Sequence, residues 1–263
     1  MSNQEDWAKS LAKWAIPQEI LDQAQTSPWI HPPVLFQVPD EIIVTSSHSR
    51  ALEALPIGGS VLDVGCGGGI AAFALTPPAS HVIGVDHQSE MLEMFATNAK
   101  KHGVTYEIID GFWPQVAGNV SIVDVVVCHH VVYNVAEIRP FLSALDAHAI
   151  SRVVIEMPTR HPLSNISDAW KYFWNLDRPK EPTSEDLLEV LNEIGIKPQI
   201  QYWTGPMSDR SDIDQDAEFL RIRLCLPPER LSEVRDYLLA NSFPRAREIA
   251  TIWWDVSGEI GSS

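Results

Sequence analysis

The chain has 263 residues, and 19 basic residues against 35 acidic ones give it a formal net charge of −16. Such an acidic surface repels polyanions, so nucleic acid is not expected as a partner. No run approaches the roughly 18 apolar residues of a membrane helix, the N-terminus is polar, and the three cysteines are scattered. We therefore expect a cytoplasmic protein with no membrane contact, disulfide or metal site. The oligomeric state is not indicated.

Strand and helix patterns alternate from about residue 60 onward, which is typical of an α/β protein. Helices are expected between the early strands, and the last two strands are expected to close one edge of the sheet. The predicted strands are 60–64, 81–85, 105–109, 121–128, 152–157, 198–203 and 248–255. The main predicted helices are 70–75, 89–101, 137–148, 186–194, 216–224 and 229–240.

Residues 1–50 differ in composition from the rest, with three tryptophans and five prolines. We expect a cap segment, made of a short helix and an extended proline-rich stretch, lying over one domain of residues 51–263. Trp29, His31 and Phe36 are candidates for a lid.

The first strand runs into Gly65-Cys66-Gly67-Gly68-Gly69, which precedes a helix. Glycines allow backbone amides to approach a nucleotide-like ligand closely. A dinucleotide site of the G-x-G-x-x-G type would need a glycine where Ile70 stands. Asp63 would repel a pyrophosphate but suits the ammonium and sulfonium groups of S-adenosylmethionine. The loop and Asp63 together favour S-adenosylmethionine as the ligand.

Two further acids stand at the ends of the second and third strands. Asp86 could accept hydrogen bonds from both ribose hydroxyls, or it could cap a helix. Asp110, followed by Gly111, could accept the adenine amino group or be a turn residue. Phe112 or Trp113 could then cover the adenine ring.

The fourth strand ends at His129 and His130, where methyl donor and acceptor are expected to meet. Histidine, with a pKa near ~6.5, is suited to removing a proton from a hydroxyl or carbon acceptor. Alternatively, His129 shapes the cofactor pocket and His130 packs beneath it. Glu156 and His161, at the end of the fifth strand, are either acceptor contacts or structural residues.

The chain resembles the class I S-adenosylmethionine-dependent methyltransferases, especially the small-molecule branch typified by quinone-biosynthesis methyltransferases. The resemblance is carried by V-L-D-V-G-C-G-G-G (61–69), G-V-D-H-Q-S-E-M-L (84–92), I-D-G-F (109–112) and V-D-V-V-V-C-H-H-V-V-Y (123–133). It implies an α/β fold with a Rossmann-like, mostly parallel seven-stranded sheet and helices on both faces. It also implies methyl transfer to oxygen, carbon or nitrogen of a small-molecule acceptor. A non-catalytic S-adenosylmethionine-binding or scaffolding protein is the alternative.

The resemblance further implies roles for single residues. The glycine loop would contact the methionine part of S-adenosylmethionine, Asp86 the ribose, and Asp110 with its neighbours the adenine. His87 stands where family members usually have an apolar residue. The expected cofactor contacts are Asp63, Gly65, Cys66, Gly67, Gly69, Asp86, His87, Asp110, Gly111, Phe112 and His129, and the candidate bases are His130 and His129.

Overall fold

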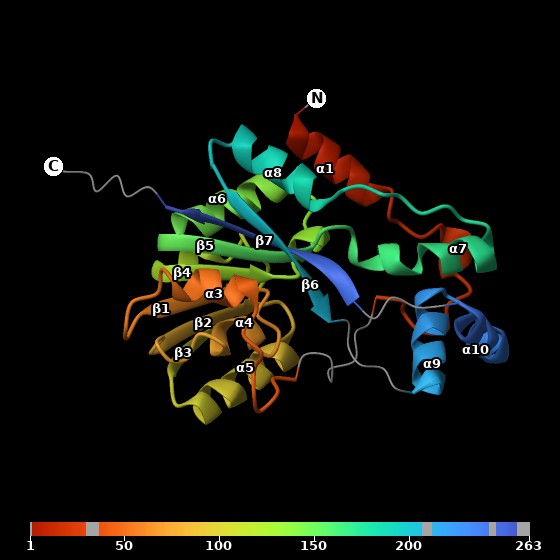
Figure 1. Ribbon diagram of the computed structural model, residues 1–263, viewed down its shortest axis with the longest axis horizontal. Coiled ribbons are helices and arrows are strands. Elements are labelled where there is room, and N and C mark those ends of the chain that lie inside the picture. The colour runs from red at the N-terminus through yellow and green to blue at the C-terminus, as the bar shows by residue number, and fades with distance from the viewer. Residues whose placement is uncertain (1, 30–36, 207–211, 242–245, 257–263) are drawn as a thin grey trace.

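The computed structural model describes residues 2–29, 37–206, 212–241 and 246–256. These residues form a seven-stranded sheet in the order β3-β2-β1-β4-β5-β7-β6 (Figure 1). The strands are β1 (Ser60–Val64), β2 (His81–Asp86), β3 (Thr105–Asp110), β4 (Val123–His129), β5 (Ala149–Pro158), β6 (Gln199–Pro206) and β7 (Ala246–Asp255). The pairings from β3 to β5 are parallel, whereas β7 is antiparallel to both β5 and β6. The predicted α/β class and the closure of one edge by the last two strands are confirmed.

Helices cover both faces of this sheet (Figure 1). One face packs against α3 (Ser46–Leu52), α4 (Ile70–Phe73) and α5 (Ser89–His102). The other face packs against α1 (Asn3–Ala12), α6 (Ile138–Ala147) and α8 (Ser184–Glu193). The central strands are almost continuously apolar because successive residues enter these two different cores.

Local signals set the helix ends as the sequence predicts. The buried residues of α5 recur at helical spacing, and the helix ends at Gly103 in the left-handed conformation. Thr183 and Asp186 form a capping box at the start of α8. No helix in the described ranges is both long and apolar enough to span a bilayer.

The N-terminal segment differs from the expected single helix, because its described residues contain three. Trp7 of α1 is buried among residues of α6 and α8, while α2 (Gln18–Leu21) joins a separate helical cluster. The third helix, α3, crosses the boundary predicted after residue 50. It begins at a capping box formed by Thr45 and His48, which is hard to recognise because histidine replaces the usual Glu or Gln. Of the predicted lid, His31 and Phe36 lie outside the described residues.

A helical lobe lies beside the carboxyl ends of β5 and β6 (Figure 1). It consists of α2, α7 (Ser167–Trp174), α9 (Ile213–Arg223) and α10 (Leu231–Ala240), which share an apolar core of their own. Because the carboxyl ends of parallel strands lie at one edge of the sheet, the lobe is on the same edge as the glycine loop.

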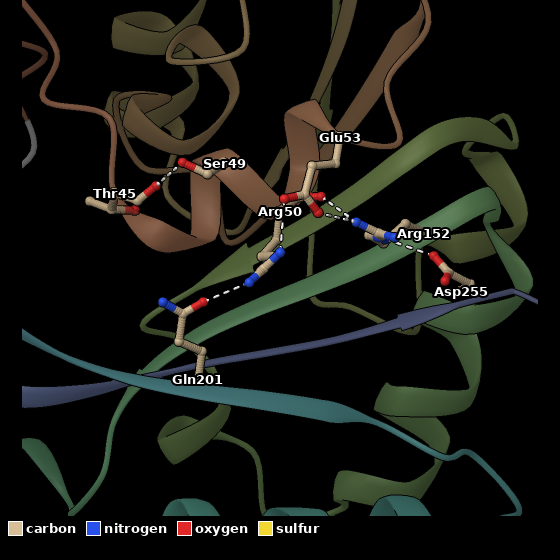
Figure 2. A network of polar contacts seen from close by, with 7 residues as sticks. All are labelled: Thr45, Ser49, Arg50, Glu53, Arg152, Gln201 and Asp255. Carbon is tan, nitrogen blue, oxygen red and sulfur yellow. Dashed lines mark hydrogen bonds and ion pairs between the residues drawn. The ribbon is translucent and has the colours of Figure 1, made fainter.

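A network of charged side chains holds α3 against the sheet (Figure 2). Arg50 pairs with Glu53 at 2.8 Å and donates a hydrogen bond to Gln201 at 3.0 Å. Arg152 of β5 contacts Glu53 at 3.1 Å and Asp255 at 2.7 Å, and it also donates to the carbonyl of Arg50. One mostly buried arginine thus joins the end of α3 to two strands.

We expect Arg152→Ala to lower the free energy of unfolding by about 1–2 kcal/mol, because it removes several charge-assisted hydrogen bonds and a packed side-chain stem. Urea unfolding measures this change. The control is Lys171→Ala, which breaks only the exposed pair with Asp177 and should cost less than about 0.5 kcal/mol. Equal losses in the two variants would show that the network adds no more than a surface pair.

Candidate active site

The glycine loop between β1 and α4 has a backbone that favours glycine. Gly65, Gly67 and Gly69 have φ angles of +74°, +50° and +93°. A Cβ at Gly65 would also overlap the side chain of Val131, which follows β4, and one at Gly69 would overlap the ring of Phe73. The loop is therefore packed directly against the segment after β4.

Asp63, at 1% exposure, is a buried acid below this loop. Its Oδ2 accepts a hydrogen bond from the Ala72 amide at 3.2 Å. Burial raises the pKa of Asp63 to about 7, and the charge of Asp86 adds to this effect. No lysine or arginine pairs with Asp63 in the part of the chain described. A cation bound here would supply the missing opposite charge.

Asp86 links the glycine loop to the end of β2. One carboxylate oxygen accepts from the Gly67 amide at 3.0 Å, and the other accepts from the Gln88 amide at 3.0 Å. The N-cap of α5 is Gln88 rather than Asp86, so the helix-cap interpretation of Asp86 is wrong. Asp110 lies opposite Asp86 in the register of β2 and β3.

Two exposed rings flank these acids. His87 and Phe112 stack with centroids 4.5 Å apart and an interplanar angle of 21°. Phe112 is 63% exposed, whereas Trp113 is buried and donates to the carbonyl of Phe141. Of the two aromatic candidates, only Phe112 presents a free ring surface at this edge.

Glu156 of β5 brings the two histidines and the N-terminal segment together. His129 lies opposite Glu156 in the sheet register. His130 follows β4 with a φ of +62°, and its Nε2 is 3.0 Å from Oε1 of Glu156. Thr45, the N-cap of α3, donates to the other carboxylate oxygen at 3.0 Å.

Electrostatics gives these groups different protonation states. Burial alone would raise the pKa of Glu156, but interactions with His129 and His130 outweigh it and hold this pKa far below its usual range. Burial lowers the pKa of His129 to about 3, despite the opposing effect of Glu156. At neutral pH, Glu156 is a carboxylate and His129 is neutral.

The structure adds residues that sequence reasoning missed. Ser47 of α3 shares a hydrogen bond of 2.7 Å with Thr251 of β7, and the ring of His48 lies 5.3 Å from that of His129. The capping pattern of Thr45 and His48 could have located the helix. Nothing local in the sequence indicates where that helix docks.

His161, a weaker candidate, has a structural role. Its Nδ1 accepts from the Leu163 amide at 3.2 Å, and its ring stacks on Trp14 at 4.0 Å. Burial and the neighbouring Arg178 lower its pKa to about 4. These contacts attach the segment between α1 and α2 to the loop after β5.

Comparison with known proteins agrees with this geometry. Residues 61–149 match the family described as a methyltransferase domain. A ubiquinone biosynthesis O-methyltransferase of Rickettsia canadensis is 31% identical over 164 residues, which cover 58% of this chain and 66% of that protein. A ribosomal protein L11 methyltransferase of Vibrio campbellii is 35% identical over 96 residues, covering 36% and 32%.

The fold is similar to that of the YcgJ protein from Bacillus subtilis, with a TM-score of 0.56 at 17% identity over 80% of this chain and 97% of that one. These matches support a class I S-adenosylmethionine-dependent methyltransferase. It spans 40% to 66% of the length of the curated relatives that it matches first.

S-adenosylmethionine is the cofactor of this family, and the residues present fit it. The ligand brings positive charge, and Asp63 is a buried acid with no cationic partner among the described residues. The ligand also brings a flat adenine, and the exposed stacked pair of His87 and Phe112 offers a ring surface. Both features lie at the carboxyl ends of β1 to β3.

The pKa of Asp63 makes cofactor affinity depend on pH. Below about pH 7 the free protein holds Asp63 protonated, and a cationic ligand must displace that proton. We expect the affinity for S-adenosylhomocysteine, which retains the ammonium group, to fall up to about tenfold per pH unit from pH 7 to 5.5. Calorimetric titration measures it.

Asp63→Asn is the matched variant, since its amide oxygen can still accept from Ala72. It should bind more weakly at pH 7.5 and lose most of the pH dependence. If the affinity of Asp63→Asn for S-adenosylhomocysteine still falls with the same slope below pH 7, the proton that competes with the ligand belongs to another group.

Proposed function

We propose that this protein transfers a methyl group from S-adenosylmethionine to oxygen, carbon or nitrogen of a small-molecule acceptor. The name of the Rickettsia relative, which refers to ubiquinone biosynthesis, supports a small acceptor. The net charge of −16 disfavours nucleic acid. The helical lobe lies on the same edge as the glycine loop and would wall the acceptor site.

The cofactor contacts that we propose follow from the geometry of the sheet edge. When bound, S-adenosylmethionine supplies a methyl group on a positively charged sulfur. Asp63 and the loop residues Gly65, Cys66, Gly67 and Gly69 would hold the methionine part, and Asp86 the ribose. The proposed adenine contacts are His87, Asp110, Gly111 and Phe112, and His129 would complete the pocket.

The hydrogen-bonded pair of His130 and Glu156 is the single observation that carries the mechanism. An ionised Glu156 accepts from Nε2 of His130, which leaves the lone pair on Nδ1. That nitrogen can take a proton from the acceptor, since the His130 side chain is 41% exposed. His129 is a weak proton acceptor because its pKa is about 3. We therefore assign the role of base to His130 alone.

Asp86→Ala tests the ribose contact. We expect it to weaken S-adenosylhomocysteine binding by about 1–3 kcal/mol, because it removes charge-assisted hydrogen bonds and the support of the Gly67 amide. Calorimetry gives the dissociation constant. Glu107→Gln, an exposed acid on the neighbouring β3, is the control and should bind as the parent does. An unchanged constant in Asp86→Ala would place the ribose elsewhere.

His130→Ala tests the base. With a dialysable metabolite extract as acceptor source, we expect S-adenosylhomocysteine production to fall roughly 100-fold or more, with cofactor affinity within about twofold. Glu156→Gln should also slow turnover, since it no longer fixes the ring. A loss of cofactor affinity alone would make His130 part of the pocket wall. Tight S-adenosylmethionine binding without turnover in the parent protein would favour the non-catalytic alternative.

A further inference from the structure

Arg247, near the start of β7, is a charged side chain without a polar partner among the described residues. Its Nε is enclosed by protein and makes no hydrogen bond. No acid within the described ranges forms an ion pair with its guanidinium. The residue as a whole is only partly buried, so the outer end of the guanidinium is not sealed from a ligand.

The missing partner sets Arg247 apart from the other arginines. Every other described arginine that is buried or half-buried has a partner. Carboxylates pair with Arg50, Arg152, Arg221 and Arg230, and backbone carbonyls accept from Arg178 and Arg223. A guanidinium that leaves water without a partner is costly, because its lost hydration is not replaced. An anion bound at Arg247 would replace that hydration.

The register of the sheet places Arg247 on the same face as the acid that holds the proposed base. Thr251 of β7 lies opposite Glu156, and its side chain bonds to Ser47 of α3. Arg247 is four residues earlier on this strand, and alternate residues of a strand share a face. It therefore lies on the α3 side of the sheet, about 13 Å along β7 from Thr251 and toward the carboxyl end of β5.

Two opposing effects act on the Arg247 guanidinium. Burial lowers its pKa, whereas the charge of Glu156 raises it. Glu156 is thus close enough to act on Arg247 through space, but its two oxygens already contact His130 and Thr45. The acid that orients the proposed base does not pair with Arg247, and the cation remains available to an anion from outside the chain.

A carboxylate matches this guanidinium in charge and shape. Its two oxygens can accept parallel hydrogen bonds from one guanidinium. A phosphate monoester would bring nearly two negative charges to a single unpaired cation, close to the charge of Glu156. We propose that Arg247 binds a carboxylate group of the methyl acceptor, so that the substrates are small carboxylic acids; this rests on the proposed methyl transfer.

The carboxylate serves as a handle and does not receive the methyl group. A carboxylate is already ionised at neutral pH and needs no base, whereas we assign proton removal to His130. Its oxygens are also weaker nucleophiles while they accept hydrogen bonds from Arg247. Arg247 is therefore a specificity residue, which fixes one end of the acceptor while another group of the same molecule faces the methyl donor.

Binding of matched probes to the protein saturated with S-adenosylhomocysteine tests this proposal. The carboxylate probes are benzoate and butyrate, their neutral counterparts are benzamide and butyramide, and phenyl phosphate is the dianion. ¹⁵N NMR of the arginine Nε–H groups reports the site, with the Arg247 signal assigned by its absence in Arg247→Met. We expect at least one carboxylate to shift this signal saturably, whereas neither amide does.

Arg247→Met removes the charge and keeps most of the apolar stem. By calorimetry it should bind the carboxylate probe roughly tenfold or more weakly, with unchanged S-adenosylhomocysteine affinity and no loss of melting temperature. Arg247→Lys should restore part of the binding, because it keeps the charge but lacks the planar set of donors. Lys197→Gln removes an exposed cation next to the opposite end of β6, and this charge-matched control should bind as the parent does.

Each contrary result has a separate meaning. Failure of the parent protein to bind S-adenosylhomocysteine would contradict the proposed function. Normal S-adenosylhomocysteine binding with no shift from either carboxylate, with equal probe binding in Arg247→Met, or with tighter binding of phenyl phosphate would overturn the carboxylate site alone. Weaker S-adenosylhomocysteine binding in Arg247→Met would assign Arg247 to the cofactor. A lower melting temperature with unchanged probe binding would assign it a structural role, and both results overturn the proposal.

Discussion

The buried charge of Glu156 determines how the edge of the sheet is assembled. An isolated carboxylate in a protein interior costs several kcal/mol, so it must find partners as the chain folds. Here one oxygen contacts His130 and the other accepts from Thr45, 111 positions away in sequence. The N-terminal segment is therefore needed to satisfy a charge on a central strand, and α3 is part of the site.

Two buried acids at this edge, Glu156 and Asp63, have pKa values shifted in opposite directions. Glu156 has its partners within the chain, and its pKa is far below the usual range. Asp63 is also buried, but among the described residues it accepts from one backbone amide, and its pKa is raised to about 7. Groups whose environments push their pKa values apart often differ in role. Glu156 has its polar partners within the chain, whereas Asp63 has no cationic partner among the described residues, so a bound cation would stabilise its charge.

Much of the sheet could be predicted from the sequence because its signals are local. Continuous apolar runs indicate buried parallel strands, and the glycine loop with Asp63 locates the cofactor edge. The positions of α3 and of the lobe could not be predicted, since they depend on contacts between segments far apart in sequence. His48 shows this limit clearly. Its helix is seven residues long, and its proximity to His129 arises only once Arg50, Arg152 and Thr251 have fixed the helix on the sheet.

The family match covers residues 61–149, which is only part of the proposed site. Residues 61–149 include the glycine loop, the acids near the carboxyl ends of β1 to β3 and both histidines at the end of β4. Thr45, His48, Glu156 and all four helices of the lobe lie outside that range. Relatives whose names refer to ubiquinone biosynthesis and to a ribosomal protein match 164 and 96 residues of this chain. Since we propose that the family-matched part holds the cofactor, we expect discrimination between acceptors to depend on the other segments, and α3 contacts Glu156 beside the proposed base through Thr45.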